Sequence, residues 1–90
     1  MSRSLRSPEH LALRELLIAA RKSAGLTQAE VAARLRRPQS FVAKYEGGER
    51  RLDVIELIEV IRAMGGDPAG VFDNLFRKIT SGRRVSSRPR

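Results

Sequence analysis

Three polar side chains that can bond to the edges of nucleotide bases fall within one short segment, residues 39–44. The amide of Gln39 can donate to and accept from the N7 and N6 edge of adenine, and the ammonium of Lys44 can donate to the guanine acceptors. The hydroxyl of Ser40 can bond to either a base or a phosphate. Such residues usually form an ordinary solvated face, so their chemistry depends on the elements that position them.

Two further positions border these three residues. Gln28 stands at the start of a predicted helix, where an amide side chain and unpaired backbone N–H groups can bind phosphate. Phe41 follows Ser40 directly, and its ring either contacts a thymine methyl group or packs on the preceding helix. Gln28 and Phe41 are therefore added to the candidate binding residues.

Capping residues and helical spacing predict five helices and no strand. Ser7 precedes a proline, and Thr27 and Asp53 each precede a glutamate by three residues, the spacing of a capping box. Pro38 and the glycines at positions 25, 47–48 and 65–66 separate the apolar-periodic segments. The predicted helices cover residues 8–24, 28–35, 38–46, 54–64 and 68–79.

The second and third predicted helices lie within residues 27–46 and are separated by a turn of three or four residues. A short helix, such a turn and a second helix with polar residues on its exposed start place the second helix in the major groove of DNA. Val42 and Tyr45 are three residues apart and should face the first two helices. This leaves the polar residues of 39–44 facing outward, as a helix-turn-helix requires.

A chain of 90 residues fits one compact domain. We expect residues 1–8 to be a flexible basic arm, residues 9–79 to be the helix-turn-helix domain, and residues 80–90 to be a disordered tail rich in Arg and Ser. The fold class that follows is all-α.

The formal net charge of +8 lies at the two ends of the chain. Residues 1–8 and 77–90 carry eight basic and no acidic side chains, whereas residues 9–76 hold ten of each. Within the body, residues 34–51 contain six basic side chains against two acidic ones. This basic region either attracts a phosphate backbone or is only a solvated face, and charge alone does not separate the two interpretations.

Other classes of function lack the residues they need. The chain has no cysteine and a single histidine, His10, so neither disulfides nor a zinc site are expected. Glu56 and Glu59 face no histidine, cysteine or Gly-rich phosphate loop, and we interpret them as solvated helix positions. The longest apolar run, residues 16–20, is too short for a membrane span or a signal peptide. We expect a cytoplasmic protein that is no enzyme and uses neither metal nor cofactor.

The sequence resembles the Cro and lambda-repressor class of helix-turn-helix proteins, the XRE family. The resemblance rests on Leu-Thr-Gln-Ala-Glu-Val-Ala at residues 26–32, on Gln-Ser-Phe-Val-Ala-Lys-Tyr-Glu-Gly-Gly at residues 39–48, and on the apolar spacing of residues 53–64. It covers roughly residues 11–76. It implies a compact, five-helix, lambda-repressor-like domain that binds double-stranded DNA.

The resemblance also assigns roles to single residues. Gln28 matches the family's phosphate-binding position at the start of the second helix. The base-contacting positions of the recognition helix are matched by Gln39, Ser40 and Lys44. Arg50 and Arg51 fall in the loop that approaches the DNA backbone in this family.

Two further features of the resemblance concern structure. It implies that Arg21 pairs with Glu46 as a structural ion pair. The turn departs from the family, which commonly has Gly, an apolar residue and a small polar cap where this chain has Arg36, Arg37 and Pro38. Arg36 then takes a left-handed conformation at a cost of about 1 kcal/mol, and Arg37 must snorkel from an apolar position. Both guanidinium groups would lie beside the recognition helix, where they can bind phosphates.

The fifth predicted helix is apolar on more of its surface than one core contact requires. These positions are candidates for a dimer interface or for burial within the monomer, namely Val71, Phe72, Leu75, Phe76 and Ile79.

We expect a transcriptional regulator, a repressor, that binds a palindromic operator as a homodimer. The alternative is an antitoxin-like module, in which the fifth helix or the tail binds another protein and DNA binding is secondary. A third interpretation is a nonspecific nucleic-acid binder that acts through its basic ends.

Overall fold

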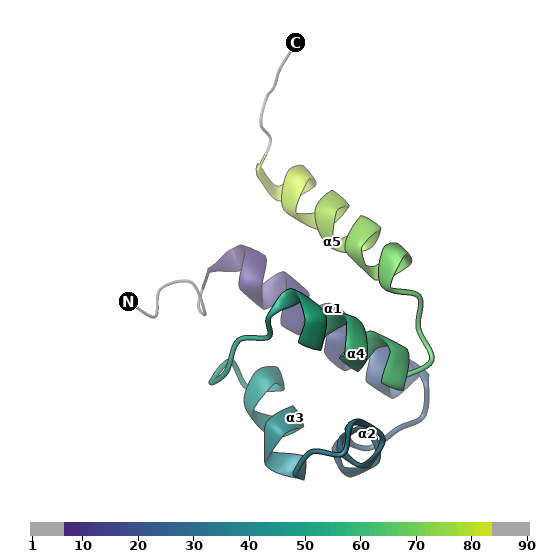
Figure 1. Ribbon diagram of the computed structural model, residues 1–90. Coiled ribbons are helices and arrows are strands. Elements are labelled where there is room, and N and C mark those ends of the chain that lie inside the picture. Colours follow the sequence, from purple (N-terminus) through teal and green to yellow (C-terminus); the bar gives the residue numbers. More distant parts are fainter. Residues whose placement is uncertain (1–6, 84–90) are drawn as a thin grey trace.

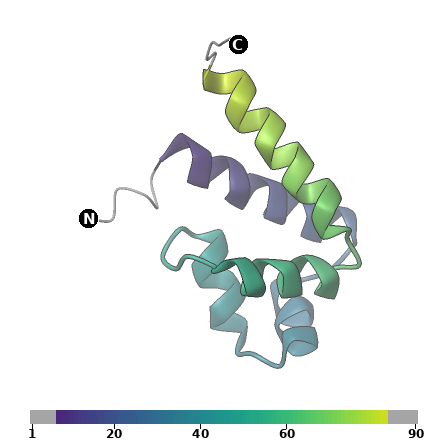
Figure 2. The same ribbon diagram turned by 45° about the horizontal axis from the view of Figure 1, so that its top comes forward.

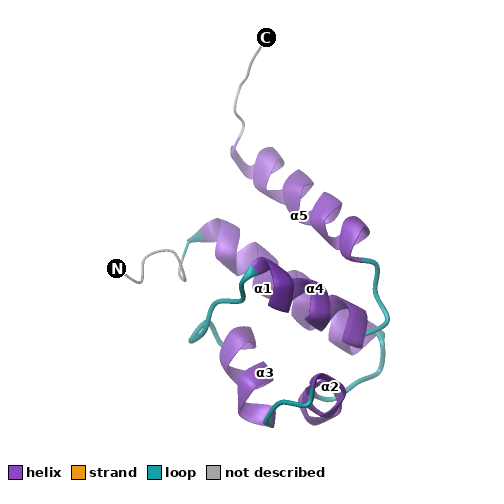
Figure 3. Ribbon diagram, in the orientation of Figure 1, coloured by secondary structure: helices purple, strands orange, loops and turns teal. Residues whose placement is uncertain are grey.

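The computed structural model describes residues 7–83, which form five α-helices and no strand (Figures 1 and 3). In chain order these are α1 (Pro8–Ser23), α2 (Gln28–Leu35), α3 (Gln39–Glu46), α4 (Val54–Ala63) and α5 (Pro68–Arg83). The prediction of an all-α, five-helix fold is confirmed. No helix in this part of the chain is both long enough and apolar enough to cross a membrane.

The ends of the described region differ from the expected arm and tail. Residues 1–6 of the expected arm and residues 84–90 of the expected tail lie outside the described residues. Residues 80–83 were expected in a disordered tail, but they continue α5. No proline interrupts the hydrogen bonds of the helix there. The hydroxyl of Thr80 donates to the carbonyl oxygen of Phe76 at 2.7 Å.

The predicted caps begin three of the helices. The side chains of Ser7, Thr27 and Asp53 each accept a hydrogen bond from the backbone N–H three residues on, at 3.0, 3.0 and 2.7 Å. Capping boxes are complete at Thr27 and Asp53, where the glutamate returns to the cap's own N–H. Pro38 has extended backbone angles and occupies the cap position of α3, so this helix begins one residue later than predicted.

The first four helices end in the same way, in a Schellman motif. After each, a residue in the left-handed conformation donates its N–H to the carbonyl three residues back, and the next residue donates to the carbonyl five residues back. This residue is glycine after α1, α3 and α4, whereas after α2 it is Arg36, with φ 59° and ψ 42°. The left-handed Arg36 expected from the turn sequence is therefore present.

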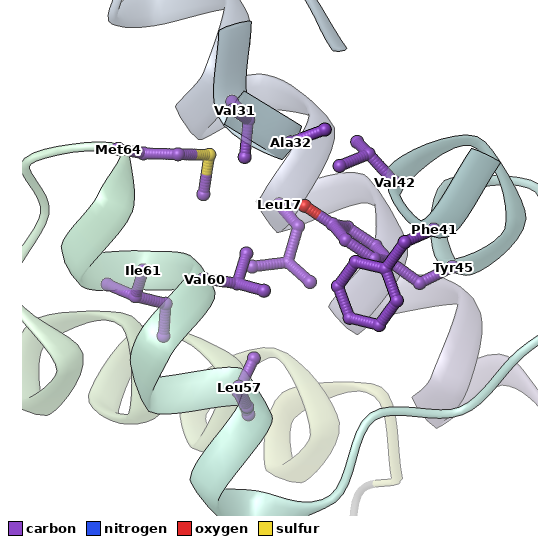
Figure 4. Close-up of a cluster of buried hydrophobic side chains, with 10 residues drawn as sticks. All are labelled: Leu17, Val31, Ala32, Phe41, Val42, Tyr45, Leu57, Val60, Ile61 and Met64. Atoms are coloured by element: carbon purple, nitrogen blue, oxygen red, sulfur yellow. The ribbon is translucent and has the colours of Figure 1, made fainter. Parts of the chain in front are cut away.

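The core is aliphatic with two aromatic rings and draws on α1, α2, α3 and α4 (Figure 4). In Figure 4, Leu17 of α1 lies at the centre, with Val60 of α4 on one side and Tyr45 of α3 on the other. Side chains with less than 2% of their surface exposed occur in all four helices, namely Leu17, Val31, Val42, Tyr45, Val60 and Ile61. This shared core holds α2 and α3 at a defined angle, which an isolated pair of eight-residue helices could not maintain.

Helix α5 lies across α1, and Val71 packs on the edge of the core (Figures 1 and 2). In both views α5 is on the opposite side of the molecule from α2 and α3, and its C-terminal half extends beyond α1. Helix α5 therefore does not cover α3.

Replacing Arg36 by glycine should stabilise the protein, because glycine adopts the left-handed conformation without a Cβ clash. We expect the free energy of unfolding to rise by about 0.5–1 kcal/mol and the thermal midpoint by about 2–8 °C. Circular dichroism melting curves measure both.

Gly25→Ala is the matched control at the end of α1. Its φ is +73°, and an added Cβ would meet no atom within 4 Å, so only backbone strain should act and the midpoint should fall. An unchanged midpoint in Arg36→Gly, with the expected fall in Gly25→Ala, would contradict a strained turn.

Candidate nucleic-acid interface

The outward side of α3 carries the predicted base-contacting residues. Gln39, Ser40 and Lys44 are exposed, and Ala43 between them is half-buried. The other four residues of the helix are buried, with 7% or less of their surface exposed, namely Phe41, Val42, Tyr45 and Glu46. Because a helix turns about 100° per residue, these two sets form two opposite faces. The structure thus brings Gln39, Ser40 and Lys44 together on one exposed face.

A hydrogen bond fixes the amide of Gln39 at one edge of this face. Its Nε2 donates to Oε1 of Gln28, the first residue of α2, at 2.8 Å. The Oε1 atom and the second N–H of Gln39 have no partner among the described residues. An amide held in this way offers an acceptor beside a donor to a ligand in front of α3, which is the pair that adenine's N6 and N7 require.

Gln28 connects this edge to the interior. While it accepts from Gln39, its own Nε2 donates to Oε1 of Glu46 at 2.9 Å. The side chain is half-buried, and both ends of its amide are occupied. Gln28 therefore positions Gln39. Its contact with phosphate stays a prediction, and the backbone N–H of Gln28, at the start of α2, can make that contact as well as the side chain.

Glu46 is a buried carboxylate, 7% exposed, paired with Arg21 of α1. Arg21 donates from Nε to Oε2 at 2.7 Å and from Nη2 to Oε1 at 3.0 Å, the two-pronged geometry of a strong guanidinium pair. A third N–H of Arg21 donates to the carbonyl oxygen of Leu26. The ion pair implied by the resemblance is present, and it joins α1, the α1–α2 turn and α3.

Two contacts in this region were not expected from the sequence. One is the bond between Gln28 and Glu46, and the other runs from Nε of Arg14 to the backbone carbonyl of Glu46 at 3.2 Å. The Arg14 guanidinium also lies against Gly48, where an added Cβ would come within 2.9 Å of it. The signal for such a close approach that the sequence offered was the glycine at position 48, shortly after the end of α3.

Phe41 does not belong to the exposed face, and of the two alternatives that the sequence left open the structure shows packing, although against Tyr45 of α3 itself. Its ring is 7% exposed and packs edge to face on Tyr45, with the centroids 5.5 Å apart. Burying the ring stabilises the domain more than leaving it at the surface of a helix. The guanidinium carbons of Arg37 and Arg50 cover the ring at 4.4 and 4.8 Å from its centroid.

The two arginines over Phe41 also meet one carboxylate, that of Glu56 at the start of α4. Arg50 donates from Nη1 to Oε1 and from Nη2 to Oε2, both at 3.0 Å, and Nη2 of Arg37 lies 3.4 Å from Oε2. We call Arg37, Phe41, Arg50 and Glu56 the Glu56 cluster. Glu56 was interpreted as a solvated position, but it is half-buried and paired, because the loop after α3 folds Arg50 back onto α4.

Hydrogen bonding to Arg50 lowers the pKa of Glu56 to about 2, and the backbone N–H of Asp53 adds to this effect. The carboxylate is therefore charged at neutral pH. Phe41 and Lys44 are three residues apart on α3, so the Glu56 cluster borders the exposed face on the side away from Gln28.

The remaining predicted phosphate ligands surround α3. Arg36, in the turn before α3, and Arg51, in the loop after it, are both exposed. Among residues 7–83, no three or more His, Cys, Asp and Glu residues gather in a way that could hold a metal ion.

On α5 the candidate interface residues divide into two sets. Val71, Leu75 and Ile79 are half-buried, whereas Phe72 and Phe76 have 37% and 68% of their surface exposed. Val71 packs on the edge of the core, and the helix as a whole contacts α1 and α4. Phe72 and Phe76 leave two aromatic rings, four residues apart, on one exposed side of the helix.

The helix pair α2–α3, its short turn and the polar face of α3 define a helix-turn-helix DNA-binding protein of the class that regulates transcription. The helix-turn-helix family model matches residues 17–71, and the chain belongs to this XRE-type family.

Solved structures give the same result. An XRE-family like protein from Pseudomonas syringae pv. tomato str. DC3000 is 47% identical, with a TM-score of 0.79 over 84% of this chain and 93% of that one. The wild-type restriction-modification controller protein C.Esp1396I is 18% identical, with a TM-score of 0.74 over 82% and 97% of the two chains. The clp gene regulator ClgR from Corynebacterium glutamicum is 22% identical, with a TM-score of 0.72 over 86% and 82%. The last two likenesses show the fold. No curated protein matches the chain significantly.

Glu46→Ala should destabilise the domain by about 3–5 kcal/mol, because it leaves the Arg21 guanidinium buried without its counter-charge. Urea denaturation of this variant, of Arg21→Ala and of the double variant measures the coupling, and the double variant should lose less than the sum of the two single losses.

The control is Asp73→Ala, which removes the exposed i,i+4 pair with Arg77 on α5 and should cost about 0.5 kcal/mol or less. If Glu46→Ala and Asp73→Ala lowered the free energy of unfolding equally, the buried Arg21–Glu46 pair would contribute no more to stability than an exposed pair, contrary to our expectation.

Proposed function

We propose that this protein is a repressor that binds a palindromic operator as a homodimer, with α3 of each subunit reading bases in the major groove. The observation that carries the proposal is the Gln28–Gln39 hydrogen bond, which holds the amide at the start of α3 in one orientation. In this proposal the protein acts by binding and not by catalysis, because a dimer bound to its operator prevents transcription by occupying the promoter.

Base reading is assigned to the exposed face of α3. The fixed amide of Gln39 suits adenine, the ammonium of Lys44 suits the guanine acceptors, and Ser40 bonds to a base or to the adjacent phosphate. Phosphate contacts are assigned to the exposed cations on either side of α3, namely Arg36, Arg37 and Arg51, and to the first N–H groups of α2.

The homodimer is assigned to α5. Phe72 and Phe76 expose aromatic surface on the side of the molecule opposite to α2 and α3, where a second copy can pack without covering the reading face. A dimer with twofold symmetry places two recognition helices about one DNA turn apart, which requires an operator with two half-sites.

Gln39→Ala should weaken binding to the selected operator by about 1–3 kcal/mol and relax the preference at one adenine position only. Lys44→Ala should do the same at a different position. Random-site selection on the purified protein supplies the operator, and competition with single-base variants of it measures the preference at each position.

A chain that ends at residue 83 separates α3 from the basic tail. It should keep the sequence preference, and only the salt dependence of binding should become shallower. Loss of all binding in that chain, or equal losses on every sequence for Gln39→Ala, would reject base reading by α3.

Phe76→Ser should shift the solution mass from dimer to monomer, because it removes the more exposed of the two aromatic rings from α5. Ile55→Ser is the matched control, since Ile55 is 64% exposed at the start of α4 and lies outside the proposed interface. Light scattering at several protein concentrations measures both.

A wild-type protein that is monomeric at working concentration would contradict the homodimer. In that case the exposed rings of α5 would favour the alternative, an antitoxin-like module that binds another protein.

A further inference from the structure

The two guanidinium groups of the Glu56 cluster are held unequally. Arg50 makes two hydrogen bonds to Glu56, both at 3.0 Å, whereas Arg37 makes one at 3.4 Å, near the outer limit for such a bond. Both side chains remain more than a third exposed. Arg50 is therefore the firmly bound partner, and Arg37 is the one that can leave at little cost.

Phe41 allows Arg37 to change partners without losing its position. The Arg37 guanidinium stacks on the ring with its carbon 4.4 Å from the centroid, and this contact is independent of Glu56. A stacked guanidinium keeps the N–H groups on its edge available to an oxygen ligand. Arg37 stands directly before α3, so those N–H groups lie beside the exposed face that carries Lys44.

A carboxylate and a phosphate offer a guanidinium the same kind of ligand, a pair of charged oxygens. Glu56 thus occupies one donor of Arg37 that a DNA phosphate would take. Its capping box fixes it there, since Oε1 accepts from the Asp53 N–H at 3.0 Å and the Glu56 N–H donates to Asp53 at 2.7 Å.

We propose that Glu56 competes with DNA phosphate for the guanidinium of Arg37. When a duplex binds, Arg37 leaves Glu56 for a backbone phosphate, while Arg50 stays bound to Glu56. This inference rests on the proposed function, because it concerns the approach of a duplex to α3. Phosphate contacts supply most of the affinity for DNA of any sequence. By weakening one such contact on all sequences, Glu56 increases the share of the affinity that comes from bases.

The carboxylate is charged throughout the pH range in which the assay is run, since hydrogen bonding to Arg50 holds its pKa at about 2. Competition is thus present whenever the protein meets DNA, and it needs no change in pH.

The test compares Glu56→Gln with Glu59→Gln. Glutamine at position 56 can still complete the capping box, and the two variants change the net charge equally on the same helix. Glu59 is exposed and has no bond to Arg37 or Arg50. Dissociation constants are measured on the selected operator and on an unrelated duplex of equal length, over a range of salt concentrations.

We expect Glu56→Gln to bind both duplexes roughly three- to tenfold more tightly than Glu59→Gln does, by the same factor on each. The salt dependence should be the same in the two variants, because Arg37 contacts a phosphate in both complexes and the number of phosphate contacts does not change. In an Arg37→Ala background, Glu56→Gln should bind no more tightly than Glu59→Gln.

Glu56→Asp is a second variant that leaves the net charge unchanged. Its shorter side chain retracts the carboxylate from Arg37, so binding to both duplexes should again tighten. Equal effects of Glu56→Gln and Glu59→Gln, or weaker binding by Glu56→Gln and Glu56→Asp, would overturn the proposal. Equal affinity of the wild-type protein for the two duplexes would instead reject base reading, and the comparison on the unrelated duplex would still decide the role of Glu56.

Discussion

The buried carboxylate of Glu46 is the constraint around which the DNA-binding half of the molecule is arranged. A charge with 7% of its residue surface exposed must be paired, and the partner is Arg21 of α1. A second contact, to the Leu26 carbonyl in the turn after α1, holds Arg21 in place. The same carboxylate accepts from Gln28, and Gln28 accepts from Gln39. The buried ion pair and the exposed amide of Gln39 are therefore linked through one residue, Gln28, by two hydrogen bonds.

The two edges of the exposed face of α3 are held by different kinds of interaction. On one edge neutral amides are joined in a directional chain, which orients Gln39. On the other edge, two cations, one carboxylate and an aromatic ring share a small volume in the Glu56 cluster. Amides suit the recognition of a base, because each presents a donor and an acceptor at fixed positions, whereas guanidinium groups suit phosphate. The turn between α2 and α3 contributes to the second edge, because it places Arg36 and Arg37 directly before α3. It does so even though Arg36 must adopt the left-handed conformation that favours glycine.

Most of the architecture follows from local signals that act within a few residues. Thr27 with Glu30, and Asp53 with Glu56, are capping boxes because both partners are three residues apart on the chain, and the glycines after α1, α3 and α4 end those helices for a reason that is equally local. The two faces of α3 follow from the period of the helix. The end of α5 is the exception to this local control. Thr80 has a low helix propensity, yet the helix continues through it to Arg83.

The sequence by itself determined the five helices, the class of DNA-binding protein and the outward set of Gln39, Ser40 and Lys44, since these depend on caps, helical spacing and the sequence motifs of the helix pair. Only the tertiary structure decided which side chains meet. Phe41 is buried, Glu56 is paired with two arginines, and Gln28 joins Gln39 to Glu46 across separations of 11 and 18 residues. A carboxylate on a helix is equally suited to water or to a guanidinium. Its partner depends on how the chain brings distant residues together, and no local pattern records that.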